Sequence, residues 1–452
     1  MTDKATPVNQ PPLACVILAA GQGTRMKSSL PKILHPVASF PMIHHVVRAC
    51  EALAPQKVVV VVAPAMEPVQ AAVAPHACAI QQQPLGTGDA VKAAREALSG
   101  FEGHILVLFG DTPLITPASL TALRERLMQD KAALAVAGFV PADPAPYGRL
   151  VMDEAGRLQA IVEAADATPA QKAITLCNGG IMLFKASALW SLLDQVGNDN
   201  AKGEYYLTDC IALAAKQGLP VTTTTLDADD VRGVNTRVQL AEVEAVMQSR
   251  LRKAHMLAGV TMIDPATVFL AADTVMGRDV SIGPNVVFAT GVVIEDNVEI
   301  RAFSHLDQVT VKKGAIIGPF VRLRPKSVIG EAAHIGNFVE IKNTKVAKGA
   351  KVNHLSYIGD ASVGEKTNIG AGTITCNYDG FTKAHTEIGA GAFIGSNTAL
   401  VAPVTIGDGA IIAAGSTITQ DIPSDALAIA RERQTNTEGW AGRFRALQKT
   451  KS

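Results

Sequence analysis

The chain has 452 residues, more than one hydrophobic core usually organises, so its length favours two or three domains, and we start from two. Hydrophobic residues make up 48% and charged residues 18%, a balance that favours a globular fold over disorder. Lys plus Arg and Asp plus Glu are equal at 41 each, so no net field attracts nucleic acid or an anionic membrane. Any phosphate binding therefore has to be local.

The cysteines and the N-terminus indicate the compartment. Six cysteines are scattered without CxxC spacing, and we interpret them as reduced thiols of a cytoplasmic protein. Residues 1–12 are polar and lack the apolar segment of a signal peptide, and no later apolar stretch reaches about 18 residues. We expect neither secretion by that route nor a membrane span.

The first half of the chain alternates short apolar runs with helix-like segments, which is typical of an open α/β sheet. We therefore expect a Rossmann-like domain over residues 1–236. A segment with helical spacing and no Gly or Pro, residues 237–256, indicates a connecting helix, for which we expect a linker over 237–258. The predicted strands are 14–20, 57–63, 104–109 and 133–140, and the predicted helices between them are 41–53 and 89–98.

Beyond Gly259 an apolar residue returns at every sixth position, often followed by glycine. This period predicts a parallel β-helix over residues 259–452, because each hexapeptide forms one face of a triangular coil and its aliphatic side chain fills the narrow interior. A β-sandwich would show alternation with a period of two. Phase breaks mark expected excursions, the longest between Ile374 and Ile388. The repeated positions include Leu270, Met276, Ile282, Phe288, Ile294, Ile300, Leu306, Ile317, Leu323, Ile329, Ile335 and Ile341.

A glycine-rich loop follows the first predicted strand: Gly21-Gln22-Gly23-Thr24-Arg25-Met26, with Lys32 close behind. Glycines at this place let backbone N–H groups converge on phosphate oxygens, and the two cations add charge where a triphosphate would lie. The spacing matches neither a dinucleotide fingerprint nor a Walker loop. A simple strand-to-helix turn remains an alternative.

The strand predicted at 104–109 ends in Gly110-Asp111, at the sheet edge where open α/β folds bind ligands. Asp111 is a candidate to hold Mg²⁺ against phosphates, although a lone Asp after a strand is also a common turn or cap residue. Its assignment depends on the other polar loops, which contain Gln81, Pro84-Leu85-Gly86-Thr87-Gly88, Tyr147-Gly148-Arg149, Glu163, Cys177-Asn178-Gly179-Gly180 and Gly233-Val234-Asn235.

In order and spacing these motifs resemble the N-acetylglucosamine-1-phosphate uridyltransferase family along nearly all of the first half. The resemblance implies in-line attack of a sugar phosphate on the α-phosphorus of UTP, release of pyrophosphate, and Mg²⁺ held by Asp111 and Asn235. Residues 27–29, Asp89 and residues 164–165 are unusual for the family, and the resemblance implies no role for any of them. The implied UTP and UDP-N-acetylglucosamine site comprises Leu18, Gly21, Arg25, Lys32, Gln81, Gly86, Thr87, Gly148, Glu163, Asn178 and Asn235; within it, Gly148, Glu163 and Asn178 hold the sugar.

Cations, a histidine and tyrosines gather where the hexad phase breaks. Cations suit a sugar phosphate, and a histidine suits proton removal from an amine. Considered singly, His354 is better explained as a solvated or hydrogen-bonded residue of the solenoid. Besides His354 and Arg322, the group comprises Arg324, Lys342, Tyr357, Asn368, Asn377, Tyr378 and Lys383.

The segments 353–360, 368–372 and 377–380 resemble the acetyltransferase half of the same bifunctional family, which is a left-handed β-helix. The resemblance implies that His354 is the general base that deprotonates the 2-amino group of glucosamine 1-phosphate as it attacks acetyl-CoA. It further implies a homotrimer with sites between neighbouring β-helices. Arg324, Lys342, Tyr357, Asn368, Asn377, Tyr378 and Lys383 would hold the amino sugar phosphate, and Ala371, Ser396, Ala414 and Arg431 would contact acetyl-CoA.

The sequence thus predicts a bifunctional enzyme of UDP-N-acetylglucosamine synthesis with glucosamine 1-phosphate, acetyl-CoA and UTP as small-molecule partners. Two alternatives remain. The β-helix could serve only oligomerisation or regulation of a nucleotidyltransferase, or the chain could be a catalytically silent nucleotide-binding scaffold. The residues around His354 argue against the first, and the match of both Asp111 and Asn235 to metal positions argues against the second.

Overall fold

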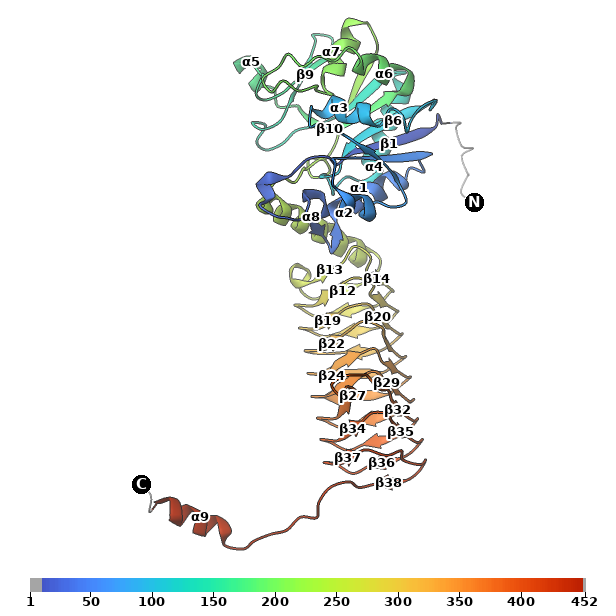
Figure 1. Cartoon of the computed structure of the whole chain (residues 1–452), viewed down its shortest axis with the longest axis vertical. Helices are drawn as coiled ribbons and strands as arrows, with labels where there is room; N and C mark the ends of the chain where they lie inside the picture. The colour runs from blue at the N-terminus through green and yellow to red at the C-terminus, as the bar shows by residue number, and fades with distance from the viewer. Residues whose placement is uncertain (1–9, 450–452) are drawn as a thin grey trace. The chain divides into compact units, whose positions relative to one another are not determined.

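The computed structural model describes residues 10–449, which fall into two compact units that divide between Arg250 and Leu251. The first unit is an α/β domain whose central sheet has the strand order β11-β7-β10-β6-β1-β4-β5 (Figure 1). The central strands β1, β4, β5 and β6 are parallel, and β10 runs antiparallel to β6 and β7. The strands are β1 (Leu13–Leu18), β4 (Lys57–Val62), β5 (Ala77–Ile80), β6 (His104–Phe109), β7 (Leu134–Phe139), β10 (Cys177–Lys185) and β11 (Val221–Thr225), with β8 (Arg149–Met152) and β9 (Leu158–Val162) as a side ribbon and β2 (Pro36–Val37) and β3 (Phe40–Pro41) as a small hairpin.

Helices cover both faces of this sheet, because its central strands are apolar on both sides. On β1, Cys15 and Ile17 pack into one core, whereas Val16 and Leu18 pack into the other. The first core is closed by α1 (Met42–Glu51), α2 (Glu67–Ala72) and α4 (Pro117–Gln129), and the second by α3 (Thr87–Ala93), α6 (Ala186–Leu193) and α7 (Asp209–Lys216). The predicted open α/β sheet is confirmed.

The predicted elements of this unit lie close to the observed ones, and the largest difference is in the helix predicted at 89–98. That helix begins earlier, at Thr87, because the backbone of Gly86 adopts a positive φ of 114° and turns the chain into it. It ends at Ala93, and turns continue to Gly100. Short elements complete the unit: α5 (Pro169–Lys172) and the 3₁₀ turns Thr24–Met26 and Lys32–Leu34.

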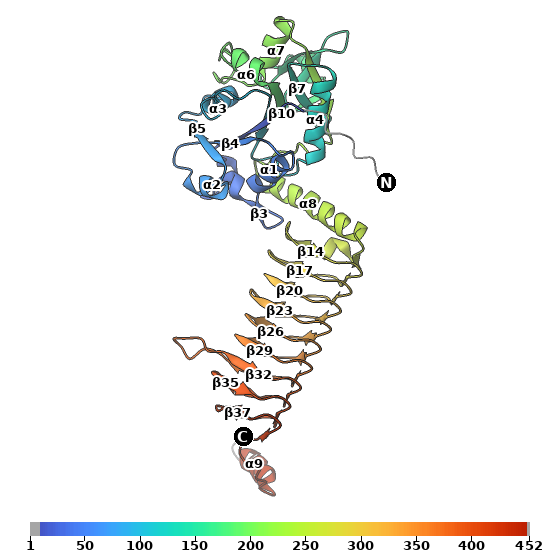
Figure 2. The same ribbon diagram turned by 90° about the vertical axis from the view of Figure 1, so that its right-hand side faces the viewer.

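The second unit is a stack of coils whose strands form three parallel sheets (Figure 2). The predicted inward residues of the hexads line one continuous core, in which Ile282, Ile317 and Ile335 are each 0% exposed and Met276 is partly buried. The predicted β-helix is therefore confirmed. The first sheet comprises β12 (Thr261–Met262), β15 (Ser281–Ile282), β18 (Glu299–Ile300), β21 (Ile316–Ile317), β24 (His334–Asn337), β27 (Lys351–His354), β30 (Asn368–Ile369), β33 (Phe393–Ile394), β36 (Ile411–Ile412) and β38 (Leu427–Ala428).

Like the first sheet, each of the other two sheets is built from single strands of successive coils. The second comprises β13 (Phe269–Leu270), β16 (Val287–Phe288), β19 (His305–Leu306), β22 (Arg322–Leu323), β25 (Glu340–Lys342), β28 (Tyr357–Gly359), β31 (Ile374–Cys376), β34 (Ala399–Val401) and β37 (Thr417–Ile418). The third comprises β14 (Val275–Met276), β17 (Val293–Ile294), β20 (Val309–Val311), β23 (Ser327–Ile329), β26 (Lys345–Val346), β29 (Ala361–Val363), β32 (Thr386–Ile388) and β35 (Val404–Ile406).

Most phase breaks in the hexad pattern are shortened corners, which corrects the expectation that they mark excursions. Ile282 pairs with Ile300, eighteen positions later, whereas Ile300 pairs with Ile317, seventeen positions later. The sheets stay in register because a corner loses one residue. The excursion predicted between Ile374 and Ile388 is present: residues 377–385 leave the coil as a loop closed by a bridge between Tyr378 and Lys383 (Figure 2).

A long helix, α8 (Arg237–Leu257), begins where the sequence predicted a connecting helix, and the division between the units lies inside it. In the second unit, the 3₁₀ turn Pro265–Thr267 follows β12, and α9 (Trp440–Lys449) has no buried residue. Among the helices that the structure describes, none combines the length and apolarity needed to cross a membrane.

Candidate active sites

A cavity of about 310 Å³ opens at the C-terminal ends of β1 and β6 in the first unit. Ligands of open α/β sheets bind at this edge, because the loops after the parallel strands converge there. Glu204, which the sequence analysis missed, also lines it. Seven residues predicted to bind nucleotide or metal lie in its lining: Leu18, Gly21, Lys32, Gln81, Gly86, Thr87 and Asp111.

Lys32 links the two predicted metal ligands. Its ammonium group forms an ion pair with Asp111 and donates a hydrogen bond to the Asn235 amide oxygen at 3.1 Å. The two oxygens therefore converge on one point, although their residues are separated by more than a hundred positions in the sequence. The structure brings Asp111 and Asn235 together as the resemblance implied.

Gln81 is oriented by a residue to which the sequence analysis gave no role. Its Nε2 donates to the Asp89 carboxylate at 2.9 Å and to the carbonyl of Gly86 at 3.0 Å. Because both amide hydrogens are used, the Gln81 carbonyl oxygen is left to accept from a ligand. Asp89 thus selects the orientation of the amide. A carboxylate two residues after a Gly-Thr turn is a weak signal, so sequence reasoning could not single it out.

The residues predicted to hold the sugar form a second group outside that lining. The backbone N–H of Asn178 donates to the Gly148 carbonyl at 2.8 Å, and a Cβ at Gly148 would lie 3.3 Å from Glu163 Oε2. Burial raises the pKa of Glu163, and a hydrogen bond from Thr208 partly offsets this. Arg25 lies exposed on the turn after β1, and the structure gives it no contact with either group.

In the second unit, His354 lies at the exposed end of β27. Its Nδ1 is 2.7 Å from Oδ1 of Asn337, which occupies the matching position of the preceding coil. An amide oxygen only accepts, so Nδ1 carries the proton and Nε2 presents its lone pair. The imidazole is thereby set in the tautomer that a general base requires.

The residues predicted to contact acetyl-CoA continue the column of His354. In the first sheet Val352 pairs with Ile369, Ile369 with Ile394, and Ile394 with Ile412. The residues two positions after these are His354, Ala371, Ser396 and Ala414, which therefore stack at about 4.8 Å per coil. At the end of the column, the Arg431 guanidinium donates to the Ala414 carbonyl at 2.8 Å.

A charged cluster lies along the second sheet and its loop. Lys342 lies close enough to Lys383 to lower the pKa of that ammonium through a hydrogen bond and charge repulsion. Asp360, only 9% exposed, accepts hydrogen bonds from the side-chain amides of Asn343 and Asn377. Burial raises the pKa of Asp360, but these bonds and the two lysine charges outweigh it and leave the pKa lowered.

Tyr357 and Asn377 join this cluster, since the Asn377 amide lies 3.5 Å from the Tyr357 hydroxyl. Arg324 directly follows β22 of the same sheet, one coil before Lys342 and two before Tyr357, and its guanidinium binds Glu340 at 2.8 Å. Tyr378 is exposed on the loop, with its hydroxyl donating to the Gly380 carbonyl at 2.6 Å. Asp360, Asn343 and Asn337 escaped the sequence analysis, because polar residues at solenoid corners are common and only the stacking of coils reveals their partners.

One predicted substrate residue lies apart from the cluster. Asn368 precedes the buried Ile369 on the first sheet, so alternation places its side chain outward on that face. Lys342 and Tyr357 belong to the second sheet. Within one chain, the two parts of the predicted amino sugar site therefore lie on different faces of the β-helix.

Comparisons with known proteins agree with both halves. Residues 15–175 match the MobA-like NTP transferase domain, and residues 273–308 and 385–420 match the bacterial transferase hexapeptide. The chain is 55% identical over 440 residues to the bifunctional protein GlmU of Paramagnetospirillum magneticum, covering 97% of this chain and 98% of that protein. The GlmU proteins of Azorhizobium caulinodans and Zymomonas mobilis are 52% and 50% identical, covering 96% and 97% of this chain and 98% and 99% of their own.

The chain belongs to the GlmU family. This confirms the predicted family and both predicted activities, uridylyltransferase and glucosamine-1-phosphate acetyltransferase, in a chain that carries both kinds of domain. The alternatives in which the β-helix is only a scaffold, or in which the chain is catalytically silent, are set aside. What the GlmU assignment leaves open is which side chain performs each step.

Proposed function

We propose that His354 is the base of the acetyl transfer. The observation that carries this proposal is the hydrogen bond from its Nδ1 to Asn337, which leaves the Nε2 lone pair free. Nε2 takes a proton from the 2-amino group of glucosamine 1-phosphate as the nitrogen attacks the thioester carbonyl of acetyl-CoA. The amide bond forms as the carbon–sulfur bond breaks, and coenzyme A leaves.

In the charged cluster of the second sheet, Lys342 and Lys383 bind the phosphate of that substrate. Lys342 and Lys383 place two ammonium groups close together beside the single carboxylate of Asp360, so the cluster keeps an excess of positive charge that a phosphate would neutralise. Asn377 and Tyr357 lie against the same cluster and would position the amino sugar near His354. Acetyl-CoA would lie along the column of Ala371, Ser396 and Ala414, with Arg431 at its end, which directs the thioester toward the base.

The first unit then uridylylates the product. Gly21, Gln81, Gly86 and Thr87 would hold the uridine part in the cavity, Arg25 and Lys32 the phosphates, and Gly148, Glu163 and Asn178 the sugar. Attack by the sugar phosphate oxygen on the α-phosphorus needs no protein nucleophile, so the protein contributes alignment and neutralisation of charge.

The residues present fit a magnesium ion. Among the described residues no group of three or more His, Cys, Asp or Glu side chains could hold a metal, but Asp111 and Asn235 offer two oxygens that already share one cation, the Lys32 ammonium. Mg²⁺ is commonly bound by one or two protein oxygens together with substrate phosphates. When bound, it would neutralise charge on the phosphates. Lys32 would then be released from Asp111 to contact the same phosphates.

The acetyltransferase site is completed by a second copy of the chain. Asn368 lies on the first sheet and Lys342 and Tyr357 on the second, so on one chain these two parts of the site face different directions. An exposed column of Phe303, Phe320 and Phe338, with ring centroids 4.9 Å and 5.1 Å apart, lies at the corner beside the second sheet. Such a column suits burial against another copy. A homotrimer, the assembly implied by the resemblance, satisfies both observations.

The test of these assignments is a substrate-omission assay on the whole chain. Glucosamine 1-phosphate, acetyl-CoA, UTP and Mg²⁺ should together yield UDP-N-acetylglucosamine. Without acetyl-CoA, product should form only when N-acetylglucosamine 1-phosphate is supplied. Product formation from glucosamine 1-phosphate in His354→Ala, at the rate of the unchanged enzyme, would contradict the proposed base.

The functional boundaries that we propose are residues 1–236 for the uridyltransferase, 237–258 for the linker and 259–452 for the acetyltransferase.

A further inference from the structure

The first turn of α8 begins two residues after Asn235, the proposed metal ligand, and the side chain of Gln239 bonds back over this turn. Its Oε1 accepts from the backbone N–H groups of Asn235 at 2.8 Å and of Thr236 at 3.1 Å. In return, the backbone N–H of Gln239 donates to the Thr236 hydroxyl at 3.2 Å. This reciprocal pair is a capping box, which satisfies N–H groups that the start of a helix otherwise leaves without partners. One amide oxygen thus fixes the backbone of Asn235 against the helix.

The same segment is tied on its other side to Asp111, the second proposed metal ligand. The backbone N–H of Val234 donates to the Asp111 carbonyl at 2.9 Å. The Val234 side chain is 0% exposed and lies in a small core with Met26 and with Val243 of α8. Asn235 is therefore held from two directions, by the helix that follows it and by the loop after β6.

Arg237, in the same first turn, reaches the loop that carries the two proposed phosphate-binding cations. Its Nε donates to the Met26 carbonyl and its Nη1 to Nδ1 of His35, both at 3.3 Å. A guanidinium group only donates, so the imidazole nitrogen accepts. Met26 ends the 3₁₀ turn that contains Arg25, and His35 directly follows the 3₁₀ turn that begins at Lys32. One guanidinium therefore spans both turns of the loop.

We propose that Gln239 is a positioning residue for the metal ligand Asn235. Arg237 has the corresponding role for the loop of Arg25 and Lys32. Neither Gln239 nor Arg237 lines the cavity of about 310 Å³, so each acts through the residues that it holds. The inference rests on the roles proposed above for the residues that are held. It gives the first turn of α8 a part in uridylyl transfer beyond that of a linker.

Binding of Mn²⁺, a paramagnetic substitute for Mg²⁺, tests Gln239 without turnover. The full-length enzyme is saturated with UDP-N-acetylglucosamine in the absence of pyrophosphate, and free Mn²⁺ is measured by electron paramagnetic resonance. Gln239→Met should weaken Mn²⁺ binding about tenfold, the loss expected when a residue that orients a metal ligand is removed. Gln239→Glu keeps an oxygen that accepts both bonds and should bind Mn²⁺ within about twofold of the unchanged enzyme. Val238→Met, exposed on the same turn, is the matched control and should change nothing.

Asn235→Ala, measured in the same way, separates this inference from the metal assignment beneath it. Weak Mn²⁺ binding in Asn235→Ala together with normal binding in Gln239→Met would overturn the role of Gln239 alone. Normal binding in both variants would remove Asn235 from the metal site, and the role of Gln239 with it. A lower midpoint temperature of unfolding in Gln239→Met, with Mn²⁺ binding unchanged, would show that the capping box serves only stability and would also overturn the proposal.

Arg237 is tested through the KM for UTP. Because Arg237 is exposed, Arg237→Met should raise this KM only about threefold, with kcat unchanged. Arg237→Lys keeps the charge but cannot bond both acceptors, so it should not restore the KM. Lys185→Met is the control for a lost cation, since Lys185 also donates to a backbone carbonyl, that of Lys131.

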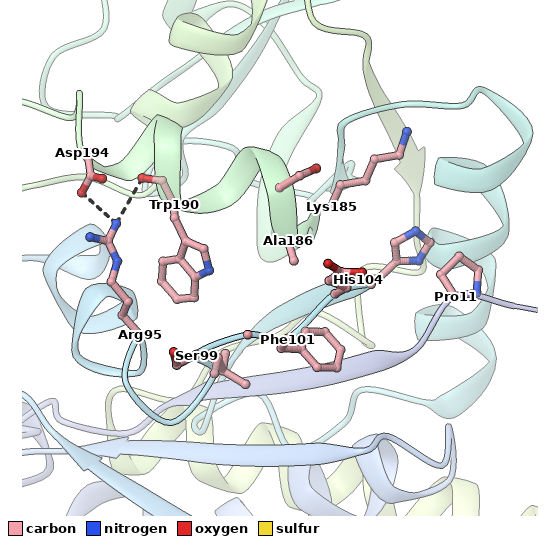
Figure 3. A pocket seen from close by; sticks show the side chains of 14 residues that line it. Pro11, Arg95, Ser99, Phe101, His104, Lys185, Ala186, Trp190 and Asp194 are labelled. Carbon is pink, nitrogen blue, oxygen red and sulfur yellow. Dashed lines mark hydrogen bonds and ion pairs between the residues drawn. The ribbon is translucent and has the colours of Figure 1, made fainter.

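The control residue lies far from the loop. Lys185 lines a separate cavity of about 800 Å³ and pairs with His104, at the opposite end of β6 from Asp111 (Figure 3). Lys185→Met should therefore leave the KM for UTP unchanged. A KM restored by Arg237→Lys, or raised equally by Lys185→Met, would show that charge alone is responsible and would overturn the role of Arg237.

Discussion

The imidazole of His354 and the amide of Asn337 form a hydrogen bond of 2.7 Å across two adjacent coils of the β-helix. Seventeen residues separate them in sequence, yet they occupy the same corner position. The bond sets which imidazole nitrogen carries the proton. Asn337 is thus the positioning residue for the base that we propose.

Replacement of Asn337 tests this relationship. Asn337→Ala should lower kcat for acetyl transfer by about 10- to 100-fold, because the tautomer and ring orientation of His354 are no longer fixed. The KM for glucosamine 1-phosphate should change little. Asn337→Asp, which keeps an accepting oxygen, should restore most of the rate.

His354→Ala should abolish acetyl transfer with uridylyl transfer near normal, and equal loss of both activities in a folded protein would argue against separate sites.

Asp111→Ala should have the opposite effect on the two reactions. Loss of the carboxylate that faces Lys32 should lower Mg²⁺-dependent release of pyrophosphate by about 100-fold or more. Acetyl transfer, measured as release of free coenzyme A, should remain unchanged. Asp89→Ala is an informative companion, since loss of the oxygen that accepts from Gln81 should weaken UTP binding while leaving the metal dependence intact. Unchanged pyrophosphate release in Asp111→Ala would remove Asp111 from the metal site.

Asp360→Asn separates binding from turnover in the acetyltransferase. An amide at this position cannot accept hydrogen bonds from both Asn343 and Asn377 as the carboxylate does, so Asn377 should lose its fixed orientation and kcat should fall about tenfold. Removal of a negative charge beside Lys342 and Lys383 should at the same time lower the KM for glucosamine 1-phosphate. A rise in KM with unchanged kcat would show that Asp360 serves the phosphate site alone.

Two inactive variants should complement each other if the site is shared between copies. Asn368→Ala and Lys342→Ala are each expected to lose acetyl transfer. In mixed trimers, about a quarter of the sites would combine an intact Asn368 with an intact Lys342 from another copy and regain activity. Light scattering should report a trimer for each variant and for the mixture. No recovery in mixed trimers would place the whole site on one chain.

The stability of the first unit should depend on His104 at acidic pH. Its pKa is lowered from 6.5 to about 4 in the folded protein, so unfolding takes up a proton between these values. Stability should therefore fall as pH falls from about 6.5 to about 4, with a slope of at most about 1.4 kcal/mol per pH unit. His104→Asn should make the midpoint temperature of thermal unfolding depend less on pH across this window. An unchanged pH slope would show that His104 titrates normally.

Sequence patterns predicted the elements that depend on local periodicity. The strand expected at 104–109 is β6, and the hexad residues Ile282 and Ile317 point into the β-helix, because burial on a strand repeats regularly. Motif order also indicated that Asp111 and Lys32 belong to one site. These features are encoded within short windows or by resemblance.

The remaining features depend on which distant residues stack. Asn337 meets His354 only because a seventeen-residue coil brings them into register, and hexad periodicity alone did not distinguish a shortened corner from an excursion. Asp89 acts on Gln81 through side-chain geometry after a turn. The cavity of about 800 Å³ that His104 lines joins segments from three parts of the chain, and none of them carries a motif.

The loop at residues 377–385 is inserted at a single corner, and the coils on both sides continue their pairing, with Ala361 opposite Thr386 and Ile374 opposite Ala399. Each coil bonds only to its neighbours, so extra residues at a corner need not disturb the rest of the stack. The loop is therefore a segment that can be replaced while the coils on both sides keep their pairing. Grafting a loop of different length or charge between Asn377 and Thr386, which keeps the buried Asn377 and its hydrogen bond to Asp360, offers a route to acceptors other than an amino sugar phosphate.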